Sequence, residues 1–192
     1  MFIAHYLHYG TLCQLREIVR TNQTVLDEDA AVDNIKPLII PFSQAVRQLR
    51  ALSAANQAVR RLYSFPLVCT YLVANLVDVI ICLIFVGLNL DLGNLLYIGT
   101  FFLYQFYLAY LNSRIEAILG ELSRQYSRSA WERRGEAESR SVICCSAELR
   151  SVYGHFLQVR IFSLVTIDYG FVFQMAFFAL FYSLLISQTN QL

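Results

Sequence analysis

Long apolar runs alternate with charged segments along the chain, and the last apolar run is the clearest. Residues 161–192, IFSLVTIDYGFVFQMAFFALFYSLLISQTNQL, contain one charged residue, Asp168, and the 24 residues after it are uncharged. About 20 apolar residues are enough to cross the hydrocarbon core of a bilayer. The pattern therefore predicts a membrane-spanning helix over 161–188, followed by a short tail, 189–192.

Two further apolar runs precede it. The first, 64–88, has Pro66 near its start, and a helix tolerates proline in its first turn. The second covers 95–113, and the six-residue link 89–94, NLDLGN, separates the two runs. These runs predict two more membrane-spanning helices that form a tight antiparallel hairpin.

Residues 1–63 contain no apolar run long enough to span a membrane. Residues 1–15 fit either the end of an earlier spanning helix or an amphipathic segment on the membrane surface. The acidic stretch 25–33 predicts a surface loop. Over 42–63, apolar residues recur three or four positions apart with arginines between them, which predicts an amphipathic, basic helix leading into the membrane.

Residues 114–160 form the longest polar segment between two apolar runs. Apolar residues at helical spacing extend the preceding helix past the membrane boundary. Residues 123–141, SRQYSRSAWERRGEAESRS, predict a solvated loop. Residues 144–160 predict a second amphipathic helix that leads to the last span.

Composition agrees with a membrane protein. The 192 residues are 57% hydrophobic and 15% charged, with a mean hydropathy of +0.48, whereas soluble domains are about 45–50% apolar and about 25% charged. We therefore expect an all-α, integral membrane helical bundle with three transmembrane helices and long cytoplasmic helical extensions. A net charge of +1 gives no reason to expect a nucleic-acid partner.

The arginines predict the orientation. The link 89–94 has one aspartate and no Lys or Arg, whereas 114–160 has eight arginines and 42–61 has four. Cytoplasmic loops carry the excess of Lys and Arg. We therefore expect 1–63 and 114–160 in the cytoplasm, the link outside, and an extracellular C-terminus.

Metal, cofactor and enzyme functions find no support in the motifs. His5, His8 and Cys13 are close in sequence, but nothing nearby completes a four-ligand zinc set. The adjacent Cys144 and Cys145 fit either reversible palmitoylation or a plain thiol pair. No nucleophile elbow, phosphate-binding glycine loop or HExxH motif occurs, so we expect neither a cofactor nor enzymatic activity.

Asn22-Gln23-Thr24 is an acceptor sequence for N-glycosylation. We expect Asn22 to be unmodified, because the predicted orientation puts it in the cytoplasm.

Asp78 and Asp168 lie inside predicted spans. An ionisable residue there is a candidate functional residue by default. The structural alternatives are an interhelical hydrogen bond or protonation in place, and Asp168 could also be solvated at the inner membrane boundary. Gln105 and Gln174 predict interhelical hydrogen bonds more than ligand contacts.

The last run contains a motif similar to one known family. TIDYGFVFQ, 166–174, and FYSLLISQT, 181–189, resemble the last helix of insect gustatory receptors and, more distantly, of insect odorant receptors. That helix often reads F-x-x-D-x-x-x-x-F and then Thr-Tyr, five hydrophobic residues and Gln-Phe. Among the positions that the chain keeps are Asp168, Tyr182 and Gln188.

Two positions depart from the pattern, with Phe181 where Thr is usual and Thr189 where Phe is usual. The order of predicted elements is also similar to the C-terminal half of these receptors. The resemblance implies a gustatory receptor subunit in the plasma membrane, whose three spans match the last three of seven helices, and we expect the chain to be part of a longer receptor.

The resemblance further implies a ligand-gated, non-selective cation channel that detects small-molecule tastants as a homo- or heterotetramer. In that family the last helix lines the pore, which carries over to Leu185, Gln188 and Thr189 on one helical face. Leu185 is then the candidate hydrophobic gate, because apolar constrictions close pores by dewetting. The candidate ligand contacts are Tyr97, Tyr104 and Gln174, which the resemblance suggests, together with Asp78; the alternative for all four is an interhelical contact.

A different class of protein is the alternative to this interpretation. A three-pass membrane adaptor or assembly protein would have the same spans, with a last helix that only packs and no conductance of its own.

Overall fold

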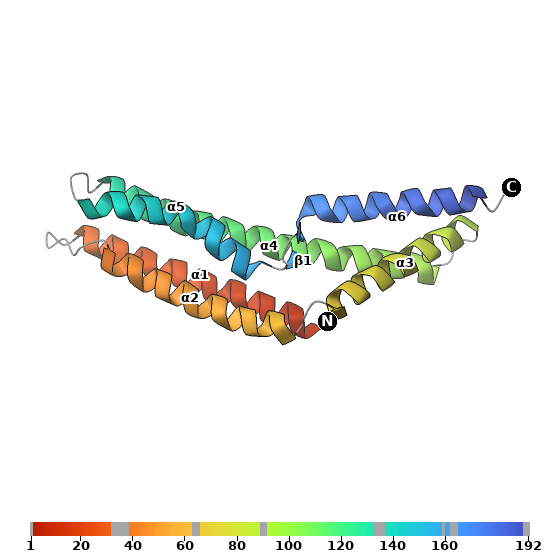
Figure 1. Cartoon of the computed structure of the whole chain (residues 1–192), viewed down its shortest axis with the longest axis horizontal. Helices are drawn as coiled ribbons and strands as arrows, with labels where there is room; N and C mark the ends of the chain where they lie inside the picture. Colours follow the sequence, from red (N-terminus) through yellow and green to blue (C-terminus); the bar gives the residue numbers. More distant parts are fainter. Residues whose placement is uncertain are drawn as a thin grey trace. The chain divides into compact units, whose positions relative to one another are not determined.

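A computed structural model of the chain describes residues 2–31, 39–62, 66–88, 92–132, 137–158, 160–161 and 165–189. Nearly all of these residues are helical, with one short strand pair and a few connecting residues, so the predicted all-α class is confirmed (Figure 1). The helices are α1 (Phe2–Ala31), α2 (Ile39–Leu62), α3 (Pro66–Leu88), α4 (Leu92–Glu132), α5 (Ala137–Leu157) and α6 (Tyr169–Thr189). Strands β1 (Arg160–Ile161) and β2 (Val165–Thr166) pair antiparallel.

The chain divides into two compact units. The polar unit comprises Met1–Leu62 and Ser113–Gln158, and the apolar unit comprises Tyr63–Asn112 and Val159–Leu192. Helix α4 contributes residues to both. Fourteen of the fifteen Lys and Arg residues belong to the polar unit.

The boundaries between the units fall within two residues of the membrane boundaries that the sequence predicts. Those predicted boundaries follow residues 63, 113 and 160, whereas the units divide after 62, 112 and 158. Packing and hydropathy thus divide the chain at the same points.

In the polar unit, helix α2 packs against α1 and α5. Each helix has buried residues three, four or seven positions apart, so one stripe of each faces the core. The largest fully buried aliphatic side chains of this unit are Leu12, Leu15, Leu49, Ile115, Leu119, Leu122 and Leu157.

Tyr126 of α4 joins three helices of the polar unit. Its side chain is fully buried, and its hydroxyl lies 2.6 Å from Asn22 Oδ1 on α1 and 3.0 Å from the carbonyl O of Pro41 on α2. Its ring meets that of Phe42 edge-on, with centroids 5.0 Å apart. Burial raises the pKa of the Tyr126 phenol, so the hydroxyl stays protonated and keeps its hydrogen for these acceptors.

Both polar atoms of the Asn22 side-chain amide make hydrogen bonds. Nδ2 donates to the carbonyl O of Ile18 at 2.7 Å, Oδ1 accepts from Tyr126, and the residue is only 5% exposed. In the folded protein the acceptor nitrogen of the glycosylation sequence is therefore inaccessible, a second reason to expect an unmodified Asn22.

The predicted loop 123–141 is wrong for most of its length, because α4 continues to Glu132 and α5 begins at Ala137. Its polar residues pack between these helices. Ser123 Oγ donates to the carbonyl O of Ser146 at 2.7 Å, and the hydroxyls of Ser127 and Ser146 lie 2.8 Å apart. Small hydroxyls that satisfy one another fit a helix interface as well as a solvated loop.

The predicted acidic loop 25–33 is also wrong up to Ala31, where α1 ends. Leu26 lies four residues after Asn22 and is likewise buried, so the packed stripe of α1 continues into this stretch. Tertiary packing therefore overrides its acidic composition.

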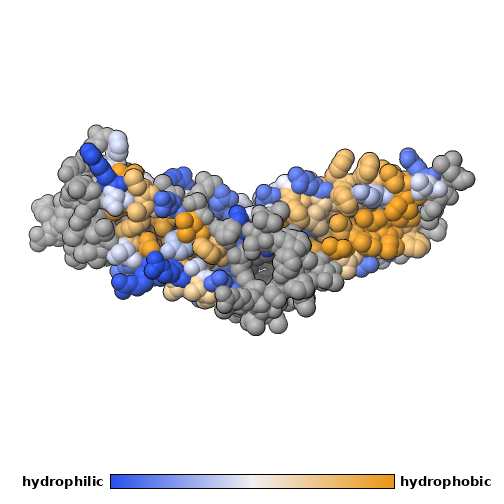
Figure 2. All heavy atoms as spheres, in the orientation of Figure 1, coloured by the Kyte–Doolittle hydropathy of each residue, from blue (hydrophilic) through white to orange (hydrophobic). Residues whose placement is uncertain are grey.

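In the apolar unit, α3 packs against α6. One core cluster contains buried residues of α3, α4 and α6: Leu72, Val79, Phe101, Met175 and Ala179. A second combines Leu108 and Ala109 of α4 with Ile167 and Val172. Large apolar side chains also cover the outside of this unit, and its visible face is mostly orange (Figure 2).

Among the described residues, one helix, α6, is long and apolar enough to cross a membrane. Helix α3 has a shorter apolar stretch, Leu72–Phe85. The last helix begins at Tyr169 and not at the predicted residue 161, because the strand pair and Asp168 precede it.

Replacing Tyr126 with Phe tests the junction of α1, α2 and α4. We expect the free energy of unfolding to fall by about 1–3 kcal/mol, because two buried acceptors lose their donor. Thermal unfolding of the purified protein in detergent, followed by circular dichroism, measures the change. Tyr153→Phe is the control, since Tyr153 is a largely buried tyrosine of the same unit with no hydroxyl partner among the described residues. Equal effects of the two substitutions would contradict the proposed role.

Candidate functional site: the outward face of the last helix

Asp168 caps the start of α6. Its Oδ1 accepts a hydrogen bond from the backbone N–H of Phe171 at 2.7 Å, and its carbonyl O accepts from Val172 N at 3.1 Å. This is the geometry of an N-cap residue, which satisfies one of the free N–H groups of a first helical turn. Asp168 thus has a structural partner, but this partner belongs to the first turn of α6 and not to another helix. The Asp168 side chain itself is exposed.

Asn112 makes a hydrogen bond to Ile167, the residue just before this cap. Its Nδ2 donates to the carbonyl O of Ile167 at 2.8 Å, and both residues are 1% exposed. Asn112 is the last residue that α4 contributes to the apolar unit. The start of α6 is therefore fixed to α4 by a buried hydrogen bond as well as by the cluster around Ile167.

A second asparagine acts at the end of α5, within the polar unit. Asn56 Nδ2 donates to the carbonyl oxygens of Phe156 at 2.9 Å and Leu157 at 3.3 Å. The last carbonyls of a helix have no partner inside the helix. The chain between α5 and α6 is thus held at each side by one asparagine amide, and no sequence motif marks either residue.

Helix α6 has two opposite faces. The buried face consists of Val172, Met175, Ala179 and Ser183. The outward face consists of Gln174, Phe177, Phe181, Leu185 and Gln188, all exposed. At about 100° per residue, the centres of these faces lie about 180° apart. Only the first face packs on the rest of the apolar unit.

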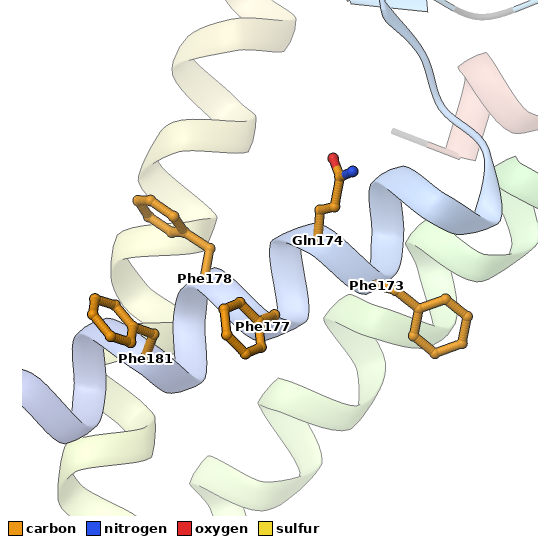
Figure 3. Close-up of a pocket in the computed structure, with 5 residues that line it drawn as sticks. All are labelled: Phe173, Gln174, Phe177, Phe178 and Phe181. Atoms are coloured by element: carbon orange, nitrogen blue, oxygen red, sulfur yellow. The ribbon is translucent and has the colours of Figure 1, made fainter.

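The aromatic part of the outward face, together with the flanking Phe173 and Phe178, forms an open hollow of about 360 Å³. Its lining residues all come from α6 (Figure 3): Phe173, Gln174, Phe177, Phe178 and Phe181. The rings of Phe177 and Phe181 stack with an interplanar angle of 17°. The hollow is almost wholly apolar, with Gln174 as the one polar residue of its lining.

The three residues expected at the pore lie on or beside the outward face. Leu185 is 45% exposed, and Gln188 and Thr189 are exposed as well. The Thr189 hydroxyl donates to the carbonyl oxygens of Leu185 and Ile186, at 3.1 and 2.9 Å. Its hydrogen is therefore engaged with its own helix, and its lone pairs point elsewhere.

Tyr182, the tyrosine of the motif, lies beside the same surface. Its ring centroid is 4.3 Å from that of Phe178 and 5.7 Å from that of Phe181. The motif residue therefore belongs to an aromatic cluster on the outside of α6.

The candidate ligand contacts do not form one site. Asp78 and Tyr97 lie together, with the Tyr97 hydroxyl 3.5 Å from Asp78 Oδ2 and 3.0 Å from Asn75 Oδ1. Tyr104 packs against the cluster around Ile167. Gln174 lies on the outward face of α6. Asn75 also belongs to the group of Asp78 and Tyr97, although no sequence pattern marks it.

Gln105 differs from its prediction. It is fully buried on α4, and neither its Oε1 nor its Nε2 has a hydrogen-bond partner in the part of the chain that the structure describes. The predicted interhelical hydrogen bond is therefore wrong within these residues. Gln174, for which an interhelical hydrogen bond was likewise expected, is exposed.

The cysteine and histidine candidates belong to the polar unit. Cys144 and Cys145 are free and exposed on α5, and Cys13 is free and exposed on α1. The side chains of His5 and His8 lie outside the described residues. In the described parts of the chain, no three His, Cys, Asp or Glu residues are grouped as a metal site would need.

No protein-family model, no curated protein and no solved structure matches the chain.

Two substitutions at Asp168 distinguish a capping role from a role for its charge. Asp168→Ala should destabilise the protein by about 1 kcal/mol, because Ala cannot cap a helix, whereas Asp168→Asn should have little effect, because Asn caps as well as Asp. Hydrogen exchange at the amide of Phe171, together with thermal unfolding, measures both. If Asn were as damaging as Ala, the charge and not the cap would matter.

Removing the unsatisfied amide of Gln105 should stabilise the protein. We expect Gln105→Leu to raise the free energy of unfolding by about 1–3 kcal/mol, because a buried polar group without a partner costs about that much. Gln174→Leu, at an exposed position of α6, is the control and should change it by less than about 0.5 kcal/mol. A loss of stability in Gln105→Leu would show that the amide has a partner in the native protein.

Proposed function

We propose that the chain is a membrane-embedded subunit of a ligand-gated, non-selective cation channel, similar to an insect gustatory receptor, in which the outward face of α6 lines the ion path. The observation that carries this proposal is the two-faced α6. Its buried face holds it to its own subunit, and its exposed face ends in Leu185 and Gln188.

Helix lengths support three membrane spans. Helix α3 has 23 residues and α6 has 21, which at 1.5 Å per residue give about 35 and 31 Å. The part of α4 in the apolar unit, 92–112, is as long as α6. Each length fits the hydrocarbon core of about 30 Å. The distribution of Lys and Arg between the units supports a cytoplasmic polar unit and an α6 that runs outward.

The surface of the apolar unit supports embedding. Phe177 is 71% exposed, Leu103 71% and Val73 62%, and these residues come from three different helices. Soluble proteins rarely expose contiguous apolar surfaces of this kind, whereas lipid or a neighbouring subunit covers them favourably. A helix that is apolar on all sides, as α6 is, belongs in such surroundings.

The order of side chains along the outward face suits a gate. Gln174 and Gln188 offer polar groups at its two ends, and Phe177, Phe181 and Leu185 lie between them. In a ring of four subunits around a central axis, the apolar segment would form a constriction that excludes water when closed. The glutamine carbonyl oxygens would meet cations on either side of it, without a fixed charge to favour one cation.

Small-molecule tastants would open this constriction from a site in the apolar unit, and the subunits would assemble as homo- or heterotetramers. The competing function, a three-pass adaptor without conductance, uses the same outward face only for packing.

Alanine substitutions at the outward face separate the two functions. We express the reading frame that contains this chain in cultured cells with a calcium indicator and apply a panel of tastants. The double variant Leu185→Ala/Gln188→Ala should raise the resting calcium signal about twofold or more, because a smaller apolar side chain weakens the dewetted gate.

Leu180→Ala is the matched control for that experiment. Leu180 is 51% exposed on the same helix, but it lies five residues from Leu185 and so points about 140° away from it. It should leave the resting signal unchanged. A conductance that the double variant does not alter would contradict the pore assignment, and a folded protein without conductance would favour the adaptor.

A further inference from the structure

Three oxygen atoms from two helices of the apolar unit lie together outside the outward face of α6. The Tyr97 hydroxyl of α4 is 3.0 Å from Asn75 Oδ1 and 3.5 Å from Asp78 Oδ2, both on α3. Asn75 and Asp78 are three residues apart and so share one face of α3. Asp78 is exposed and Tyr97 is 36% exposed, so the group is open to a ligand.

Two acceptor oxygens share one phenol hydrogen. The Tyr97 hydroxyl carries a single hydrogen, and here it faces Asn75 Oδ1 and one oxygen of the Asp78 carboxylate. Within the described residues, the Asp78 carboxylate has this single contact at 3.5 Å and no ion-pair partner. A carboxylate in an apolar helix is costly unless a positive charge or strong donors accompany it.

The sequence offers few such charges nearby. Apart from Arg160, the apolar unit contains no Lys or Arg, and it contains no His. The oxygens also suit a metal poorly, since calcium takes six to eight oxygen ligands with several carboxylates. A compact positive group with several N–H donors matches them better.

We propose that Asn75, Asp78 and Tyr97 form a binding site for the primary ammonium group of a small organic amine. The ammonium carries three N–H donors, as many as the oxygens that converge here. Its charge pairs with Asp78, and the Tyr97 ring offers an aromatic neighbour for the organic part. Ile81, three residues beyond Asp78 and 44% exposed, extends the same face with an apolar surface.

This inference rests on the proposed function. It specifies primary amines as the class of stimulus that the channel detects. Binding alone, however, is measured without current. The full chain is purified in lipid nanodiscs, and its thermal unfolding is followed with increasing phenethylamine, which is protonated at pH 7.4. A ligand that binds only the folded state raises the unfolding temperature in proportion to its affinity.

Two further probes separate charge from donors. 2-Phenylethanol has the same ring without the positive charge, and N,N,N-trimethylphenethylammonium has the charge without N–H donors. We expect phenethylamine to bind about tenfold or more tightly than either, because a hydrogen bond to a charged group contributes about 1.5–3 kcal/mol. Equal binding of 2-phenylethanol would overturn the role of Asp78, and equal binding of the trimethylated amine would overturn the three-donor site.

Substitutions test the residues. Asp78→Asn should weaken phenethylamine binding about tenfold or more, and Tyr97→Phe should weaken it by a smaller factor, about threefold to tenfold. Tyr110→Phe, an exposed tyrosine further along α4, is the control and should bind like the unmodified chain. Unchanged affinity in Asp78→Asn would overturn the proposal, and if that variant does not fold, Tyr97→Phe and the three probes decide it.

Failure of this site and failure of the channel are distinguishable. If phenethylamine does not bind, but Leu185→Ala/Gln188→Ala alters the conductance, the amine site is wrong and the channel stands. If phenethylamine binds with the expected dependence on Asp78 while no conductance is found, the site stands in a protein that is not a channel.

Discussion

The hydrogen bond from Asn112 to the carbonyl O of Ile167 is the interaction on which the arrangement of the last helix depends. Backbone polar groups inside an apolar environment need partners, and the residues just before a helix have none within it. Asn112 satisfies the carbonyl before the cap, and Asp168 satisfies an N–H after it. Together they determine where α6 begins and, through the helical repeat, which residues face the core and which face outward.

The same two hydrogen bonds set the rotation of α6 about its axis, which decides the residues that would face the pore of the proposed channel. A helix whose sides are almost equally apolar has no pattern of its own that sets its rotation. Val172, Met175 and Ala179 are hardly more apolar than the phenylalanines opposite them. The capped and anchored first turn fixes the rotation of the helix, so that Phe181, Leu185 and Gln188 face away from α3.

Much of the fold could be predicted from hydropathy and helical spacing. The divisions near residues 63, 113 and 160 coincide with those between the two units, because the same contrast in polarity governs membrane insertion and packing. The composition of the stretches 25–31 and 123–132 wrongly predicts loops, since acidic residues and small hydroxyls are common in loops. They are helical because Leu26 and Tyr126 are buried and because Ser123 and Ser127 meet Ser146, contacts that local composition does not reveal.

The candidate site was predictable only in part. The helical repeat is enough to put Leu185 and Gln188 on one face, and the resemblance to a receptor motif drew attention to Tyr182. Asn75, Asn112 and Asn56 act through partners 22, 55 and about 100 residues away, and no local pattern marks such pairs. The signal that could have found Asn112 is its position at the end of a long uncharged run.

The occupied amide of Asn22 has a consequence for how the chain matures. An oligosaccharide can be attached to that nitrogen only while α1 is not yet packed, and once attached it would prevent Tyr126 from reaching Oδ1. Glycosylation and native packing at this position therefore exclude each other. A sugar on Asn22 would therefore mark molecules that have lost the junction of three helices around Tyr126.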